Sequence, residues 1–181
     1  KQTSGLIVAA KNDYSHASLT EQFSKRTITR AYQAVVWGVP RPLNGTIENN
    51  IGRNKYNRKK MAVLKSAGKQ AITDYKVLKR FGEFASLVEC KLSTGRTHQI
   101  RVHMADIGHP VIGDTVYGGG ISRGRRAPMN EQTSIFIKNL DGQALHAFSL
   151  GFRHPKTEKI IDFSSQLPIE IIELITLLET F

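Results

Sequence analysis

The sequence predicts a single α+β domain built around a mixed or mostly antiparallel sheet flanked by helices. Predicted strands outnumber predicted helices, and the two kinds of segment do not alternate regularly, which argues against a series of parallel βαβ units. The 181 residues suit one domain with a sizeable core. The apolar share of 40% is too high for a disordered polyelectrolyte, and no apolar run is long enough to cross a membrane.

The first part of the chain predicts a strand, a helix and a second strand. Residues 5–10 form a short apolar run that ends at a turn. Residues 15–26 carry apolar side chains on one side and charged side chains on the other, the pattern of an amphipathic helix. Residues 29–36 are rich in β-branched and aromatic side chains, and prolines and an Asn-Gly pair end this strand.

The middle of the chain predicts a hairpin, a further strand and a helix. Residues 59–64 and 71–79 are predicted to form paired strands with a Gly-Lys turn between them. Residues 85–92 form another strand candidate. A helix is expected over residues 98–107, with Thr97 as its cap and its isoleucine and methionine side chains on one face.

The last part of the chain predicts a glycine-rich basic loop, two strands and a final helix. The loop runs from residue 118 to residue 128, and the strands cover residues 144–152 and 159–163. The final helix, over residues 169–178, is very apolar and begins after a proline.

The positive charge of the chain is concentrated in three segments. Residues 49–73, 90–105 and 115–130 contain half of the 26 lysines and arginines and no acidic residue, whereas the rest of the chain has 13 bases and 15 acids. Such clustering is typical of a surface that binds the phosphates of a nucleic acid. Three solvated loops that only improve solubility are the alternative.

Several other kinds of site are not supported by the sequence. Cys90 is the only cysteine, which excludes an internal disulfide and fits a reducing compartment. His98 and His103 are five residues apart and would point to different sides of a helix, and no closed zinc spacing exists. Phosphate-binding loops, dinucleotide fingerprints and serine hydrolase elbows are also missing.

The segment 94–103 is the strongest candidate for a functional site. Gly95 allows a tight turn after a strand, and Arg96 then lies at a strand-to-helix corner beside free backbone N–H groups. A guanidinium at a helix start is a good anion clamp. The residues alone leave this interpretation open against an ordinary capped helix with surface bases.

Four separated motifs make the sequence resemble the RluA-type pseudouridine synthases. Residues 3–11 look like the end of the family's His-Arg-Leu-Asp-x-x-Thr-Ser-Gly motif, and residues 30–38 look like its tyrosine-containing strand. The most specific match covers residues 95–118. Residues 145–155 resemble the C-terminal strand motif. The basic segment 58–71 resembles the large-subunit ribosomal RNA branch of the family, closest to its RluD-like members.

The resemblance implies a fold, a reaction and a set of site residues. Members of this family isomerise uridine within RNA without a cofactor, through an aspartate that attacks the target nucleotide. The resemblance implies that Tyr32 packs against the flipped base and that Arg96 pairs with the catalytic carboxylate. Substrate-binding roles are expected for Thr3, Ser4, Gly5, Leu92, Gly95, Thr97, His98, Gln99 and Arg101, for some of which a structural role is the alternative. RNA-binding roles are expected for Arg53, Lys55, Arg58, Lys59, Lys60, Arg123, Arg125 and Arg126.

The chain departs from the family pattern at one position. The nucleophilic aspartate of the motif would immediately precede Lys1, and no aspartate within the 181 residues matches it. We therefore expect residues 1–181 to be an N-terminally truncated catalytic domain that is inactive alone. The expected partner is RNA, most specifically large-subunit ribosomal RNA, and no metal or cofactor is expected. We expect the protein to be cytoplasmic, and a monomer is favoured. A non-catalytic RNA-binding module with the same fold is the alternative.

Overall fold

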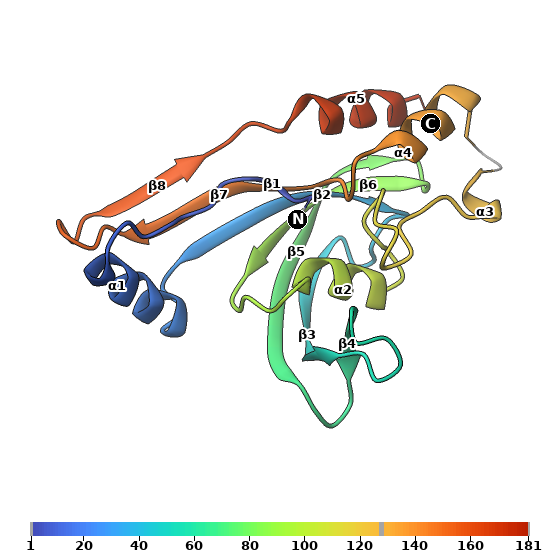
Figure 1. The fold of residues 1–181 in the computed structure, drawn as a ribbon. Coiled ribbons are helices and arrows are strands. Elements are labelled where there is room, and N and C mark those ends of the chain that lie inside the picture. Colours follow the sequence, from blue (N-terminus) through green and yellow to red (C-terminus); the bar gives the residue numbers. More distant parts are fainter. Residues whose placement is uncertain (1, 127–128, 181) are drawn as a thin grey trace.

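A computed structural model describes residues 2–126 and 129–180, apart from the side chains of Arg123 and Arg126, and the described part is organised around one sheet (Figure 1). The strands are β1 (Ser4–Gly5), β2 (Thr29–Trp37), β3 (Asn44–Arg53), β4 (Met61–Leu64), β5 (Lys69–Phe81), β6 (Ala85–Leu92), β7 (Leu145–Arg153) and β8 (Ile160–Ser164). Their order is β1-β7-β2-β6-β5-β3-β4, and β8 pairs with β7. The pairing of β1 with β7 is parallel and the other strand pairs are antiparallel, which confirms the predicted mixed, mostly antiparallel sheet.

Helices lie on both faces of the sheet. They are α1 (Asp13–Ser24), α2 (Gln99–Asp106), α3 (Arg123–Arg126), α4 (Glu131–Asn139) and α5 (Ile169–Leu178). In Figure 1, α4 and α5 lie above the sheet, whereas α1 and α2 lie below it. Because both faces are covered, the central strand β2 must bury consecutive side chains rather than alternate ones.

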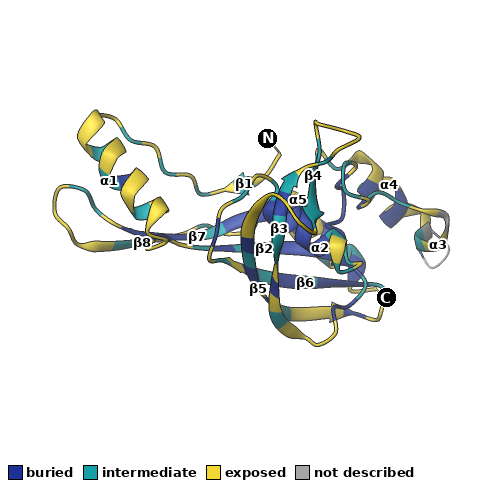
Figure 2. Ribbon diagram, turned by 90° about the horizontal axis from the view of Figure 1, so that it is seen from below, coloured by how far each residue is buried: buried dark blue, intermediate teal, exposed yellow. Residues whose placement is uncertain are grey.

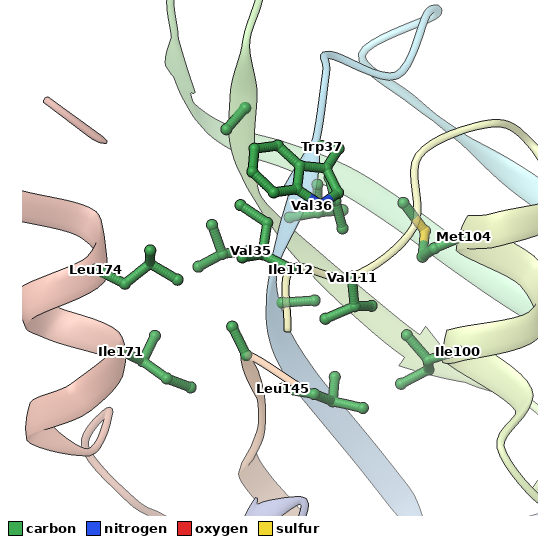
Figure 3. Packing of buried hydrophobic residues seen from close by; sticks show 14 of the residues in the cluster. Val35, Val36, Trp37, Ile100, Met104, Val111, Ile112, Leu145, Ile171 and Leu174 are labelled. Carbon is green, nitrogen blue, oxygen red and sulfur yellow. The ribbon is translucent and has the colours of Figure 1, made fainter. Parts of the chain in front are cut away.

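The main core forms around β2. Val35 and Val36 are both fully buried although they point to opposite faces of the sheet. Figure 3 shows Val35 directed toward Leu174 of α5, whereas Val111 lies on the side of α2. Val36 also forms an isolated antiparallel bridge with Val111. The apolar run in β2 therefore joins two halves of one core.

A smaller core lies at the far end of the sheet. Leu19 of α1 packs there with Ile28, Leu150 and Phe152. Figure 2 shows that α1 and β8 extend from the buried centre and are largely exposed, whereas β7 is mostly buried. This arrangement places α1 beside the first half of β2, which contains the predicted site residue Tyr32.

Two predicted elements have the same bounds in the structure, and several others agree within a few residues. The strand over 85–92 and the helix over 169–178 are found as β6 and α5. The helix α4 was not predicted. Its signal is visible in the sequence, because Asn130 caps the helix by accepting a hydrogen bond from the Thr133 N–H at 2.8 Å.

The prediction of a strand over residues 5–10 is wrong beyond its first residue. Only Ser4–Gly5 pairs with β7, and Ile7 is 90% exposed. The close approach of Gly5 to β7 has a steric cause: its φ is +103°, and a Cβ there would lie 2.3 Å from the carbonyl oxygen of Ala147. Leu6 and Val8 then pack sideways on the smaller core instead of continuing the strand.

The predicted hairpin between residues 59–64 and 71–79 is also wrong. Both of these strands exist, but each pairs with β3, which lies between them in the sheet. The Asn44-Gly45 pair, interpreted above as a turn that ends a strand, is instead the beginning of β3. A turn can be recognised from a few adjacent residues. The pairing of β4 and β5 depends instead on β3, which precedes both strands in the sequence.

Candidate functional site

Tyr32 lies at a small pocket on the face of the sheet that also carries α2. Alternate residues of a strand share a face, so Tyr32 points the same way as Val36, which contacts Val111. The pocket has a volume of about 150 Å³ and is called here the Tyr32 pocket. It is lined by Leu6, Ile7, Val8, Phe23, Arg30, Tyr32, Ala147, Ser149 and Leu150. Burial raises the pKa of the Tyr32 phenol, and Arg30 partly opposes this, so the ring is neutral at pH 7.

A second pocket with an arginine-rich lining adjoins the first. It has a volume of about 410 Å³, shares Phe23 and Arg30 with the Tyr32 pocket, and is called here the arginine pocket. It is lined by Phe23, Ser24, Arg26, Arg30, Ser93, Thr94, Gly95 and Arg96. The structure therefore brings Tyr32 and Arg96 to neighbouring pockets, although they are 64 positions apart in the sequence.

Gln99 holds the turn that carries Arg96. Its buried amide donates hydrogen bonds to the Ile72 carbonyl at 2.9 Å and to the Thr73 hydroxyl at 3.0 Å. Its carbonyl oxygen accepts from the Arg96 N–H at 2.9 Å and from the Thr94 hydroxyl at 2.8 Å. The side chain is thus occupied within the protein and positions Arg96, whose Nε donates to the Gln70 carbonyl at 2.9 Å. The substrate-binding role predicted for Gln99 stays a prediction.

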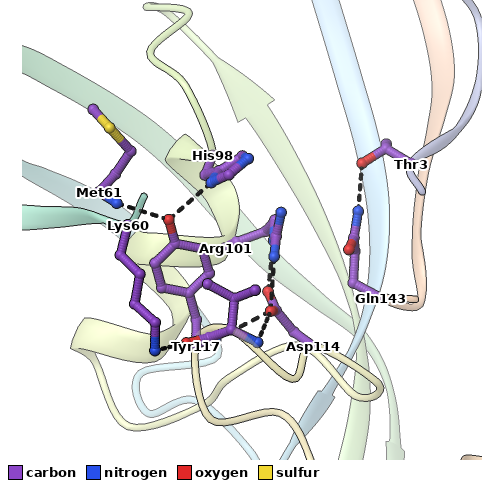
Figure 4. A network of polar contacts seen from close by, with 9 residues as sticks. Thr3, Lys60, Met61, His98, Arg101, Asp114, Tyr117 and Gln143 are labelled. Carbon is purple, nitrogen blue, oxygen red and sulfur yellow. Dashed lines mark hydrogen bonds and ion pairs between the residues drawn. The ribbon is translucent and has the colours of Figure 1, made fainter. Parts of the chain in front are cut away.

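Arg101 forms a buried, bidentate ion pair with Asp114 (Figure 4). The Nε–Oδ2 distance is 2.6 Å and the Nη2–Oδ1 distance is 2.8 Å. The guanidinium carbon lies 4.9 Å from the centre of the Tyr117 ring. Asp114 also accepts hydrogen bonds from the backbone N–H groups of Val116 and Tyr117. These contacts make Arg101 a structural anchor, and its predicted contact with substrate stays a prediction.

The same network reaches the basic segment between β3 and β4. The Tyr117 hydroxyl lies 2.8 Å from Nδ1 of His98 and accepts a hydrogen bond from the Met61 N–H at 2.9 Å (Figure 4). Lys60 donates to the Val116 carbonyl at 2.9 Å. These contacts attach the C-terminal end of the basic segment to the loop after α2, and Lys55, Arg58 and Lys59 in that segment are exposed.

The beginning of α2 differs from the predicted cap. Thr97 is exposed and does not cap the helix, so that prediction is wrong. His98 holds the N-cap position in a left-handed conformation with φ of 57°, and no side-chain hydrogen bond caps the helix. Burial is the main cause that lowers the pKa of His98, and Arg101 lowers it further.

Two other predicted RNA-binding arginines form contacts within the protein. Arg53 donates to the Arg58 carbonyl at 3.2 Å. Arg125 lies over the Trp37 ring, 5.2 Å from its centre, and donates to the carbonyls of Gly118 and Gly120. The side chains of Arg123 and Arg126 lie outside the described residues.

The predicted residues near the start of the chain contact β7 and the segment just before it, and they do not line the Tyr32 pocket. Thr3 accepts a hydrogen bond from Gln143 at 2.8 Å, and the Ser4 hydroxyl lies 2.9 Å from Nδ1 of His146. The pocket is instead lined by the next three residues, Leu6 to Val8, which sequence reasoning missed. Leu92 is half-buried, and the register of β2 and β6 places it on the face of the sheet that carries Tyr32.

His103 locks α2 onto the sheet. It is fully buried, with Nδ1 2.9 Å from the Thr73 hydroxyl and Nε2 2.9 Å from the Asn49 side-chain oxygen. Burial lowers its pKa to about 4. The imidazole is therefore neutral at pH 7 and acts as a hydrogen-bonding crosslink rather than as a charged contact for RNA.

The described residues provide neither a metal-ion cluster nor a membrane-spanning helix. Within residues 2–126 and 129–180, His, Cys, Asp and Glu side chains do not form a group of three that could hold a metal ion. In the same part of the chain, no helix combines the length and the apolar character that a membrane span requires.

Comparisons with known proteins identify related sequences. Residues 1–106 match the family model described as RNA pseudouridylate synthase. The chain is 47% identical over 175 residues to the uncharacterised RNA pseudouridine synthase YlyB of Bacillus subtilis, covering 97% of this chain and 52% of YlyB. It is 45% identical to the ribosomal large subunit pseudouridine synthase D of Neisseria meningitidis, covering 98% of this chain and 46% of that protein. The chain thus spans about half the length of these curated relatives.

A solved structure has the same fold. The human RNA pseudouridylate synthase domain containing 1 aligns with a TM-score of 0.67 and 28% sequence identity, covering 95% of this chain and 74% of the human chain. The sheet and helices described above therefore correspond to a known arrangement.

The Arg101–Asp114 pair leads to a prediction about stability. Asp114→Asn keeps the side-chain shape and an acceptor for the backbone N–H groups but leaves Arg101 buried without its counter-charge. We expect a decrease of about 3–5 kcal/mol in the free energy of unfolding, measured by urea denaturation. Glu83→Gln, which breaks an exposed ion pair with Arg41, is the control and should change it by less than about 1 kcal/mol. Equal effects of the two substitutions would contradict this role.

The buried His103 leads to a prediction about pH. Its pKa of about 4 in the folded protein lies below the ordinary 6.5, so the unfolded chain binds a proton first as the pH falls. This residue should therefore reduce the free energy of unfolding by about 2 kcal/mol between pH 7.5 and pH 5. Urea denaturation of wild type and His103→Gln at both pH values isolates this contribution. A variant that loses as much stability as wild type over this range would show the prediction to be wrong.

Proposed function

The chain belongs to the RNA pseudouridylate synthase family, and from this membership we propose that, together with the family's aspartate motif, it isomerises uridine in RNA to pseudouridine. The proposed substrate is large-subunit ribosomal RNA, because the curated relatives include the ribosomal large subunit pseudouridine synthase D of Neisseria meningitidis. The observation that carries the proposal is the adjoining position of the Tyr32 pocket and the arginine pocket. We propose residues 1–181 as one catalytic domain that acts in the cytoplasm.

The two pockets suit the two requirements of this reaction. An enzyme that modifies a base inside RNA must take the base out of its stack and give it a new packing surface. The half-buried, neutral ring of Tyr32 supplies such a surface beside the apolar side chains of Leu6 and Val8. We propose that Arg96, which lines the adjoining arginine pocket, pairs with a carboxylate next to the sugar, in the role that the family resemblance gives it. Gln99 keeps that turn in place.

The basic segment between β3 and β4 extends this site into an RNA-binding surface. Lys55, Arg58 and Lys59 are exposed, and their segment ends at Met61, which is connected through Tyr117 to His98 at the beginning of α2. Phosphate contacts made by such side chains provide affinity and orientation without reading the sequence. We propose that these bases bind the RNA around the modified uridine.

A non-catalytic RNA-binding module is the second candidate function. It is favoured by one observation: residues 49–73, 90–105 and 115–130 contain half of the lysines and arginines and no acidic residue, a pattern that RNA binding alone would explain. The neighbouring positions of Tyr32 and Arg96 favour the synthase, because a module that only binds RNA does not need an arginine to pair with a carboxylate.

Substitution of Arg96 separates the two candidates. In a version of the protein that includes the family's aspartate motif, Arg96→Met should reduce the rate of pseudouridine formation at least about 100-fold, because the charge next to the reacting carboxylate is lost. The affinity for RNA should change only a few-fold. Arg80→Met, which removes an exposed charge from β5, is the matched control and should leave the rate unchanged. No pseudouridine formation by that version before substitution would favour the binding module, and parallel losses of rate and affinity would show that Arg96 serves RNA binding rather than the reaction.

The 181 residues alone provide a second test. We propose that they form no pseudouridine because no carboxylate occupies the nucleophile position of the motif, yet bind RNA with an affinity that decreases steeply with salt. Mass spectrometry of ribosomal RNA after incubation with the purified chain measures the product. Detectable pseudouridine would refute this proposal, and RNA binding that does not respond to salt would refute the proposed surface.

A further inference from the structure

The arginine pocket contains more positive charge than the proposed pairing of Arg96 requires. Arg26 comes from the segment that follows α1, Arg30 from β2 and Arg96 from the turn between β6 and α2. The lining of this pocket contains no acidic residue. Among the described residues, none of the ion pairs involves any of these three arginines. Three cations from three separate segments thus surround one cavity without a counter-charge.

Arg30 is held in this pocket by an aromatic ring and a close backbone segment rather than by an acidic side chain. Its guanidinium lies over the Phe23 ring, with the central carbon 5.3 Å from the ring centre. On the other side it lies so close to Gly95 that a Cβ there would be 2.6 Å from Nη1. Its Nε is fully buried and has no hydrogen-bond partner in the protein. Burial is also the main cause that lowers the pKa of Arg30.

A negatively charged ligand in the cavity would supply the counter-charge that its three arginines lack. A buried donor without a partner destabilises the folded protein, and the cost is larger when the group is charged. The flat guanidinium has parallel N–H groups that match two oxygens of a phosphate. Arg30 is also two residues from Tyr32 on the same strand and face, a separation of about 7 Å. An anion at Arg30 would therefore lie close to a base on Tyr32.

We propose that Arg30, assisted by Arg26, binds an RNA backbone phosphate directly next to the uridine whose base packs against Tyr32. This inference rests on the proposed function for the identity of the base, but the phosphate contact is a separate property of the pocket. The contact fixes the sugar and base of one nucleotide relative to Arg96. Arg30 is thus a positioning residue rather than a catalytic one.

Salt dependence of RNA binding tests the contact. The probe is a twelve-residue oligouridylate, and its affinity for the full chain is measured over a range of salt concentrations. Each lost phosphate contact on a single strand should reduce the slope of log affinity against log salt by about 0.7, which is about a fivefold weaker affinity at 0.1 M salt. Arg30→Gln should show this loss. Arg30→Lys keeps the charge and should keep the slope.

A second variant tests the geometry without removing the charge. Gly95→Ala should displace the Arg30 guanidinium, because the new Cβ would lie within 2.6 Å of its Nη1. We expect a loss of slope similar to that of Arg30→Gln. Arg80→Gln removes an exposed charge from β5 and should leave the slope unchanged. Circular dichroism of each variant ensures that only folded protein is compared, and a folded Arg30→Gln variant with the slope of wild type would overturn the proposal.

A mononucleotide probe tests whether the phosphate lies next to the base. Uridine 3′,5′-bisphosphate should compete with the oligouridylate at least five times better against wild type than against Arg30→Gln, whereas uridine should not distinguish the two proteins. Competition by inorganic phosphate as strong as that of the bisphosphate would indicate a site for free anions and would overturn the proposal. If these results hold but no pseudouridine is formed by a protein with the aspartate motif, the proposed function fails and the phosphate site stands.

Discussion

The buried ion pair between Arg101 and Asp114 connects the parts of the molecule that build the candidate site. Asp114 is 1% exposed and Arg101 is 7% exposed, so the two charges have left water and depend on each other. The pair joins α2 to the loop that follows it. That loop in turn supplies Tyr117 and Val116, which fasten His98 and the basic segment between β3 and β4. An exposed ion pair would not hold these segments, because its net contribution to stability is small.

Two neutral crosslinks attach the same helix to the sheet. Gln99 and His103 both contact Thr73 of β5, one through its amide and one through its imidazole. Their polar atoms find partners inside the protein, so the cost of burial is offset. Gln99 also accepts a hydrogen bond from the Arg96 N–H. It thereby fixes the position of the strand-to-helix corner that carries Arg96.

Several polar residues of the most specific motif therefore support the site from inside the protein. Gln99, Arg101 and His103 are buried, whereas Arg96, Thr97 and His98 keep some exposure. The motif thus has a buried part that holds the helix and a more exposed part at its beginning. Arg30 and Phe23 complete the site from outside this motif, because the end of α1 lies beside the beginning of β2.

The sequence by itself determined the mixed, mostly antiparallel architecture, the positions of β6 and α5, and the family to which the chain belongs. These features depend on local apolar patterns and on motifs that are continuous in the chain. The tertiary structure decided that β3 lies between β4 and β5, that residues 6–8 line the Tyr32 pocket, and that Gln99 and Arg101 are buried. It also placed Arg30 between Phe23 and Gly95. The reason is physical: strand partners, burial and the solvation of charges depend on contacts between distant segments, which a local pattern does not contain.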